Sequence, residues 1–262
     1  MKTNTHSQIV NHFRFWGTIL LTSVFILGVA VVQVWAWSGR DYCVEELDEA
    51  EVFIEWNATD SDRGIQFFWD GEPWRWMRVK NQSGRAVLDV IAQRNVRAQG
   101  LTEGFFESAE PEESELPADA FFTRFPEGEY AFVGRTLAGC WLKGETELTH
   151  DLPAPPVLDL EFFPEISWEQ PSGVAVIGYE IVVELVVVDG EGEDEEEYVY
   201  VDTATFPGNV NGFTVSSQFL DLIDAVAEAE TLEELKVEII AIEESGNKTI
   251  TEEEVELEDL EP

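Results

Sequence analysis

An uncharged apolar run from Trp16 to Trp37 constrains this chain more than any other feature. Its twenty-two residues form a helix of roughly 33 Å at about 1.5 Å per residue, which is long enough to cross a bilayer core of about 30 Å. Lys2 and Arg14 precede the run, and the first acidic residue is Asp41. The positive-inside rule therefore predicts a cytoplasmic N-terminus and places residues 38–262 outside the cytoplasm.

Two interpretations of the run remain open. The long apolar segment and the extended basic N-region favour a retained single-pass membrane anchor. The small residues at Val34 and Ala36 are instead typical of a signal peptidase site, which predicts a cleaved signal peptide. In both cases residues 1–37 form the cytoplasmic tail and the anchor or signal segment. Residues 38–262 are then extracytoplasmic, at the cell envelope or secreted.

The charge of the extracytoplasmic part excludes one class of partner. All 54 acidic residues follow the apolar run together with 13 of the 15 basic residues, a formal net charge of −41. Because phosphate backbones are bound by basic surfaces, nucleic acid is not an expected partner. So large a net charge is more typical of solubility than of a specific cation site.

A proline-dense segment, Asp151–Pro156, predicts a linker between two domains. The preceding part, residues 38–152, carries 11 basic and 24 acidic residues, whereas residues 153–262 carry 2 and 30. Short β-branched and aromatic segments separated by Gly, Pro, Asn and Asp predict strands in both parts. The predicted fold class is all-β: an N-terminal membrane helix, a β-rich domain of unknown function, and a β-sandwich with a short helical insertion.

Several segments of the C-terminal part together resemble a fibronectin type III domain over residues 153–258. They are the proline-rich entry, Ile166–Trp168, Gly178–Ile181, Phe213–Val215 and Val237–Asn247, with its late Gly-Asn turn. The resemblance implies a seven-strand sandwich with a binding or spacer role and no catalysis. Leu235 stands where the family has a corner tyrosine, and a predicted helix within Phe219–Leu235 lengthens the preceding loop.

The N-terminal part is predicted to be a further β-rich domain. Its expected strands are Val52–Trp56, Ile65–Trp69, Trp74–Val79, Ala86–Ile91, Glu129–Val133 and Cys140–Leu148, with a helical turn in Pro117–Phe125. The stretches EWNATDSDRGIQFFWDGEPW and RFPEGEYAFVG resemble bacterial exported proteins of unknown function in which such a domain precedes a fibronectin type III domain. This resemblance implies an architecture and no chemistry.

Asp60 and Asp62 are the candidate metal ligands. The segment Asn57–Gly64 places oxygen-bearing side chains at alternating positions before a glycine, and calcium is held by six to eight such oxygens. The alternative is a hairpin turn whose Asn and Asp side chains cap backbone amides. Calcium is the single cofactor that the sequence indicates.

The two cysteines, Cys43 and Cys140, form either a disulfide, as an oxidising compartment allows, or two separate thiols. The aromatic residues raise a similar choice between a domain core and a glycan-stacking face. Because side chains alternate along a strand, Trp74 and Trp76 are expected on one face. The aromatic set is Trp56, Phe67, Trp69, Trp74 and Trp76.

No catalytic residue is predicted. His150 is the single histidine after the apolar run, and it is expected to make a hydrogen bond between the two domains. The sequence has no Gly-x-Ser-x-Gly nucleophile motif. The expected function is therefore that of a noncatalytic binding or presentation protein of the cell envelope, attached to the membrane through Trp16–Trp37, with an envelope protein or a glycan as partner. The alternative is an envelope hydrolase that acts through paired carboxylates.

Overall fold

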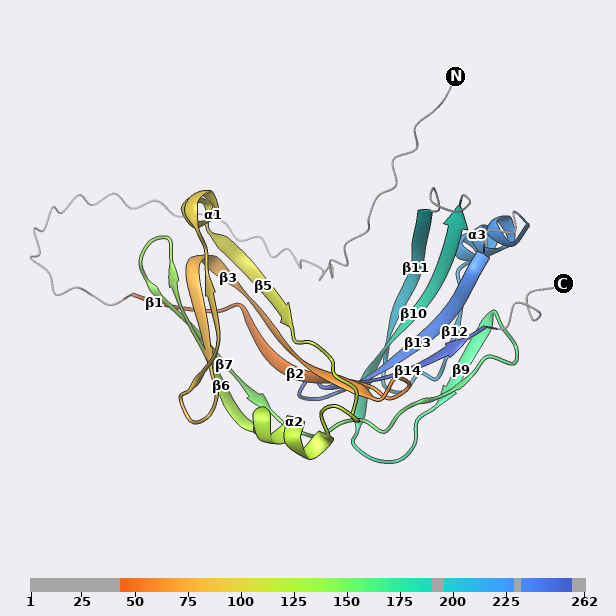
Figure 1. Ribbon diagram of the computed structural model, residues 1–262, viewed down its shortest axis with the longest axis horizontal. Helices are drawn as coiled ribbons and strands as arrows, with labels where there is room; N and C mark the ends of the chain where they lie inside the picture. Colours follow the sequence, from red (N-terminus) through yellow and green to blue (C-terminus); the bar gives the residue numbers. More distant parts are fainter. Residues whose placement is uncertain (1–42, 190–195, 229–231, 256–262) are drawn as a thin grey trace, which may run out of the picture. The chain divides into compact units, whose positions relative to one another are not determined.

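The structure is a computed structural model that describes residues 43–189, 196–228 and 232–255 (Figure 1). The predicted membrane segment Trp16–Trp37 lies outside the described residues, as does most of the acidic segment Asp189–Glu197. Within the described ranges, no helix combines the length and apolar character needed to cross a membrane. Residues 42–262 belong to one compact unit.

The described chain is mostly strand, which confirms the predicted all-β, sandwich-like fold. The strands are β1 (Val44–Glu46), β2 (Glu49–Asn57), β3 (Asp62–Lys80), β4 (Ala86–Ile91), β5 (Leu101–Glu107), β6 (Gly128–Thr136), β7 (Trp141–Leu148), β8 (Val157–Asp159), β9 (Glu165–Glu169), β10 (Val176–Asp189), β11 (Glu196–Pro207), β12 (Gly212–Thr214), β13 (Leu232–Glu243) and β14 (Lys248–Glu254). The helices are α1 (Arg94–Gln99), α2 (Ala118–Arg124) and α3 (Ser217–Glu228).

The C-terminal part is a sandwich of seven described strands. β12, β9 and β8 form one sheet, and β11, β10, β13 and β14 are neighbours in the other. Strand β10 alternates between buried and partly exposed residues, so Ile181, Val183 and Leu185 all enter one core with Trp168 of β9. A period of two is what a strand needs to bury one face against the opposite sheet.

Helix α3 covers one end of this core. The Ser216 hydroxyl oxygen accepts a hydrogen bond from the Phe219 N–H, as an N-cap residue does. Phe219 and Ile223, four residues apart, are both buried in the core. The short helix predicted within Phe219–Leu235 is therefore present, although it begins at Ser217, and Leu235 lies inside β13.

The N-terminal part is organised around β3, which is nineteen residues long. The sequence predicts two strands here, and that prediction is wrong: Gly71-Glu72-Pro73 bends the strand without ending it. The first part of β3 pairs with β2 and β5, and the second part pairs with β4 and β6. Strands β4 and β5 follow the same edge of β3, with α1 inserted between them (Figure 1).

A short parallel pairing joins the two parts. Lys248, Thr249 and Ile250 of β14 pair with Glu55, Trp56 and Asn57 of β2, so one sheet runs through both (Figure 1). Each part nevertheless has its own hydrophobic cluster. Independent folding of residues 38–152 and 153–262 stays a prediction.

Polar contacts at this junction centre on Asn247, which is fully buried. Its Oδ1 accepts the Ile54 N–H at 2.8 Å. Its Nδ2 donates to the Thr149 carbonyl at 3.1 Å, the Thr149 hydroxyl at 3.0 Å and the Asp151 carbonyl at 2.9 Å. The proline-rich segment is also held here, because the Thr249 hydroxyl donates to the Pro153 carbonyl at 2.8 Å.

Candidate functional site

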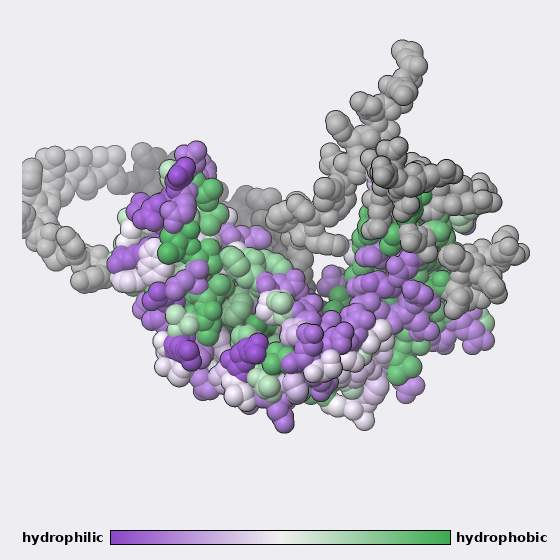
Figure 2. Space-filling view, in the orientation of Figure 1, coloured by the Kyte–Doolittle hydropathy of each residue, from purple (hydrophilic) through white to green (hydrophobic). Residues whose placement is uncertain are grey.

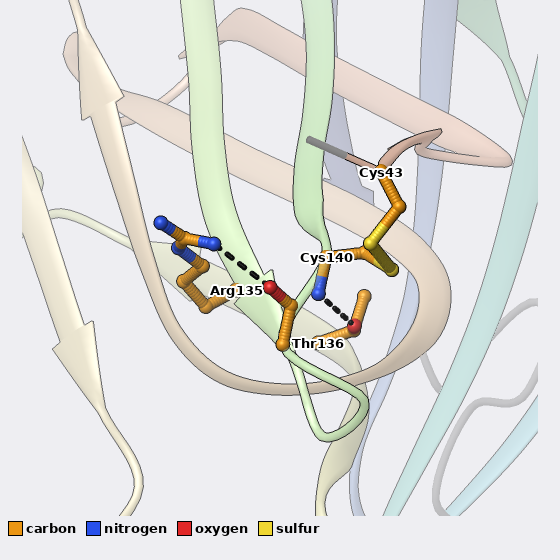
Figure 3. The surroundings of a disulfide bond; sticks show 5 residues. Cys43, Arg135, Thr136 and Cys140 are labelled. Carbon is orange, nitrogen blue, oxygen red and sulfur yellow. Dashed lines mark hydrogen bonds between the residues drawn. A yellow bond between two sulfur atoms is a disulfide. The ribbon is translucent and has the colours of Figure 1, made fainter. Parts of the chain in front are cut away.

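The structure contains a disulfide between Cys43 and Cys140, with an S–S distance of 2.09 Å and a sequence separation of 97 residues (Figure 3). It attaches the start of the described chain to the turn between β6 and β7. The Cys140 N–H donates to the Thr136 hydroxyl at 3.1 Å, and the Trp141 N–H donates to the Cys43 carbonyl at 2.9 Å. The bridge therefore fixes the end of the sheet that also carries Arg135.

The turn that holds Asp60 and Asp62 connects β2 to β3. Asn57 Oδ1 accepts the N–H groups of Thr59 and Asp60, so this oxygen is used by the turn itself. Partial burial raises the pKa of Asp62, and repulsion from Asp60, Glu252 and Glu112 raises it further. The arrangement gathers carboxylates, but calcium binding by Asp60 and Asp62 stays a prediction.

Three other carboxylates, those of Glu55, Glu107 and Glu110, lie close together. Oxygen atoms of the three groups are within 4.8 Å of one another. Burial raises the pKa of Glu55 despite Lys248, whose Nζ lies 3.7 Å from Glu55 Oε2. Partial burial and repulsion from the neighbouring carboxylates raise the pKa of Glu110 from 4.5 to about 7. We call these three residues the glutamate cluster.

A glycine makes room for the glutamate cluster. A side chain at Gly64 would place its Cβ 2.6 Å from Glu110 Oε1 and 2.9 Å from Glu110 Cγ. Gln66, on the same face of β3, donates from Nε2 to Glu107 Oε1 at 3.0 Å. The cluster thus depends on local packing that spacing along the sequence does not reveal.

Most of the aromatic set belongs to the core. Phe67, Trp69 and Trp74 are buried, and the Trp69 ring stacks on Phe106 with centroids 5.2 Å apart. The expectation that Trp74 and Trp76 share one face is wrong. The register of β3 against β6 shifts between them, and this bulge turns Trp76 away from the core.

The outer face of β3, β6 and β7 carries aromatic and basic side chains together. The register aligns Trp76 with Arg135 and Arg135 with Trp141, and the two tryptophan rings meet edge to face at 6.1 Å. The Arg135 guanidinium lies 3.7 Å from the Trp141 ring centroid, and its Nη1 donates to the Gly139 carbonyl (Figure 3). We call this surface, with Arg78 and Lys143 in the next row, the aromatic–cationic face.

Exposed apolar side chains continue from this face along the β4–α1–β5 edge. Ile91 and Phe105 are 57% and 54% exposed. Figure 2 shows hydrophilic residues over α1 with an apolar band beside them. The face is therefore a mixed surface of aromatic, basic and exposed apolar side chains.

His150 does not make the predicted hydrogen bond between the two parts. Its ring stacks on Phe122 at 4.3 Å, and Nε2 contacts the Phe125 carbonyl at 2.8 Å, so both partners lie in its own part of the chain. The adjacent residues Thr149 and Asp151 make the contacts across the junction through their backbone carbonyls. The imidazole thus has a structural role beside α2.

One stretch of the sequence is unusually basic, and this signal for a basic surface formed by β3, β4 and α1 was not used in the predictions. Residues 73–102 contain six basic residues and one acidic residue in a chain of net charge −39. The pairing of Trp76 with Trp141 could not be foreseen, because it depends on the bulge in β3. The same holds for Glu110, which reaches Glu55 from a loop.

Comparisons with known proteins give structural neighbours alone. No protein-family model matches the sequence, and no curated protein matches it. A two-domain fibronectin type III segment of chicken tenascin is similar at 10% identity, covering 80% of this chain and 98% of that one with a TM-score of 0.25. The FN1–FN3 domains of chicken CNTN1 are similar at 10% identity, 81% and 65% coverage and a TM-score of 0.30.

A third solved structure is similar at the same level. The BSP domain of a biofilm associated protein matches at 12% identity, covering 82% of this chain and 30% of that one with a TM-score of 0.24. The structural neighbours thus include fibronectin type III domains, the family that residues 153–258 resemble.

Proposed function

We propose that this protein is a noncatalytic binding or presentation protein of the cell envelope whose ligand is an envelope protein or a glycan. The observation that carries the proposal is the aromatic–cationic face, which gathers Trp76, Trp141 and Arg135 on a chain that is otherwise strongly acidic. Aromatic residues and arginine are the side chains most enriched in binding surfaces. The disulfide supports an extracytoplasmic location, since such bonds persist in oxidising compartments.

The proposed attachment is through Trp16–Trp37, either as a retained anchor or as a signal segment that releases residues 38–262. A tag placed after Pro262 and tested for protease access from outside the cell distinguishes the orientations. Protection of the tag in intact cells would contradict export.

Binding is tested with the full chain on a glycan array and in a pull-down from host envelope. The charge-reversal variant Arg78→Glu/Lys143→Glu should lose binding, because both residues belong to the aromatic–cationic face. The matched control is Arg85→Glu/Arg124→Glu, which reverses two exposed charges elsewhere. Equal binding by the wild type and both variants would rule out this face as the binding surface.

The second candidate is a carboxylate-dependent envelope hydrolase. The glutamate cluster favours it, because a glutamate with a pKa near neutrality beside a second carboxylate has the properties of a general acid. Hydrolysis of envelope glycans that disappears in Glu110→Gln and persists in Glu112→Gln would support the enzyme. Absence of any product from the wild type would leave binding as the function.

A further inference from the structure

Three arginines line one open depression at the end of the aromatic–cationic face. Arg75, Arg94 and Arg97 surround it together with Ala98 and Leu137, and its volume is about 340 Å³. Within the described ranges, none of the three guanidinium groups forms an ion pair with a carboxylate. In a chain with 54 acidic residues, arginines that stay unpaired and lie together are poised for an anion from outside.

Hydrogen bonds between three segments build the frame of this depression. The Ala92 N–H at the end of β4 donates to the Arg75 carbonyl at 2.9 Å, and the Leu137 N–H of the β6–β7 turn donates to the Pro73 carbonyl at 2.7 Å. The Arg75 guanidinium donates to the Leu137 carbonyl. This hydrogen bond occupies one nitrogen of the Arg75 guanidinium group and orients the group, whose other N–H donors are left for further partners.

The short helix α1 is pressed against this frame. Gly100, which ends the helix, has a φ of 87°, and a Cβ there would lie 2.8 Å from Pro73 Cβ and 3.0 Å from Leu137 Cδ1. A glycine therefore lets α1 approach closely enough for Arg94 and Arg97 to face Arg75 across the depression. The arrangement is fixed by packing and not by side-chain charge.

One of the two non-glycine residues with a positive φ in the described ranges lies at the same place, and the other is Ser61 in the turn between β2 and β3. Arg94 has a φ of 47°, in the left-handed region that costs free energy for a residue with a Cβ. Such strain persists where the surrounding structure holds it, and it accumulates at binding sites. Glycine would adopt this conformation more easily than arginine does.

We propose that the Arg75–Arg94–Arg97 depression binds a single carboxylate or phosphate group at the end of an envelope glycan. Guanidinium groups match both anions with paired hydrogen bonds. The formal net charge of −39 disfavours a long polyanion, whereas a single anionic end group held by the three arginines is screened from charges more than about 8 Å away in physiological salt. This inference rests on the proposed binding function and specifies its ligand.

The test is calorimetric titration of the full chain with glucuronate, with inorganic phosphate and with glucose as the neutral probe. Saturable binding of glucuronate or phosphate without binding of glucose is expected, and the tighter probe identifies the group. Arg94→Gln/Arg97→Gln should weaken that binding at least about tenfold, since charge-assisted hydrogen bonds are lost. The control Arg85→Gln/Arg124→Gln removes the same charge elsewhere and should leave binding unchanged.

A second variant separates binding from folding. Arg94→Gly should raise the urea midpoint, because the strain is relieved, while it lowers the affinity for the anion. A parallel loss of stability and affinity would overturn the assignment of Arg94, as would anion binding that the double glutamine variant leaves intact. If the chain binds envelope glycans on the array but neither glucuronate nor phosphate, the proposed function stands and this site assignment is wrong.

Discussion

Replacing Asn247 by alanine removes the side chain on which the junction between the two parts depends. Its amide group pairs with the Ile54 N–H and with the carbonyl groups of Thr149 and Asp151, which come from two separate segments of the chain. Asn247 is fully buried, and Ile54 is fully buried as well. After the substitution these backbone groups have no side chain to pair with.

The magnitude follows from counting the groups left without partners. A buried polar group that loses its partner costs about 1–3 kcal/mol, and the Ile54 N–H is the most enclosed of the three. Asp151 is exposed, so water can replace the lost bond at its carbonyl. We therefore expect Asn247→Ala to reduce the free energy of unfolding by about 3–5 kcal/mol, a large fraction of the 5–15 kcal/mol typical of a folded protein.

Urea unfolding followed by tryptophan fluorescence measures this change. Asn81→Ala is the matched control, because the Asn81 side chain also makes several hydrogen bonds to its surroundings, but in an exposed turn: its Oδ1 accepts from the Ser83 N–H and hydroxyl and from the Arg85 N–H. That variant should lose about 1 kcal/mol or less. A loss below about 1 kcal/mol for Asn247→Ala, or equal losses for both variants, would refute the reasoning.

Three further predictions address the disulfide, the glutamate cluster and the calcium candidates. Replacing Cys43 and Cys140 by serine should lower the free energy of unfolding by about 4 kcal/mol, since the bridge closes a loop of nearly a hundred residues; a urea midpoint that does not move would contradict this. Because the pKa of Glu110 is raised from 4.5 to about 7, its protonated form is favoured by folding, so stability falls as the pH rises through that range. The free energy of unfolding of Glu110→Gln should therefore exceed that of the wild type by about 1 kcal/mol near pH 8, a figure discounted for the partial exposure of Glu110, and should equal it near pH 4.5. A difference that does not change with pH in urea titrations would argue against the shifted pKa. Any saturable calcium binding seen by calorimetry should disappear in Asp60→Asn/Asp62→Asn, and binding that survives would place the ion elsewhere.

Sequence patterns predict the elements that depend on neighbouring residues, and they fail for elements whose structure depends on pairing with distant segments. Ile177–Val188 is a long run rich in β-branched residues and forms most of β10 as expected, because such residues favour strands. Gly71-Glu72-Pro73 has the composition of a turn, yet pairing with β5 and β6 on either side holds it in one bent strand. Local propensity for a turn is outweighed there by the sheet's hydrogen bonds.

The candidate sites divide in the same way. The turn at Asp60 could be proposed from its composition, since Asn and Asp cap such turns through their own side chains. The glutamate cluster could not, because Glu55, Glu107 and Glu110 come from two strands and a loop that only the sheet brings together. The basic surface could be predicted in part. Its charge is visible in the sequence of residues 73–102, but the depression lined by its arginines depends on the close approach at Gly100 and on the β6–β7 turn, which the sequence does not reveal.

The parallel pairing of β14 with β2 has a consequence for biogenesis. Residues 55–57 pair with residues 248–250, which the ribosome makes about 190 residues later, so this part of the β2 edge stays unpaired while most of the chain is synthesised. An open strand edge is a template for pairing with other chains. Until β14 is made, the β2 edge is therefore open to misassembly, and the strand that closes it is the last one in the described chain.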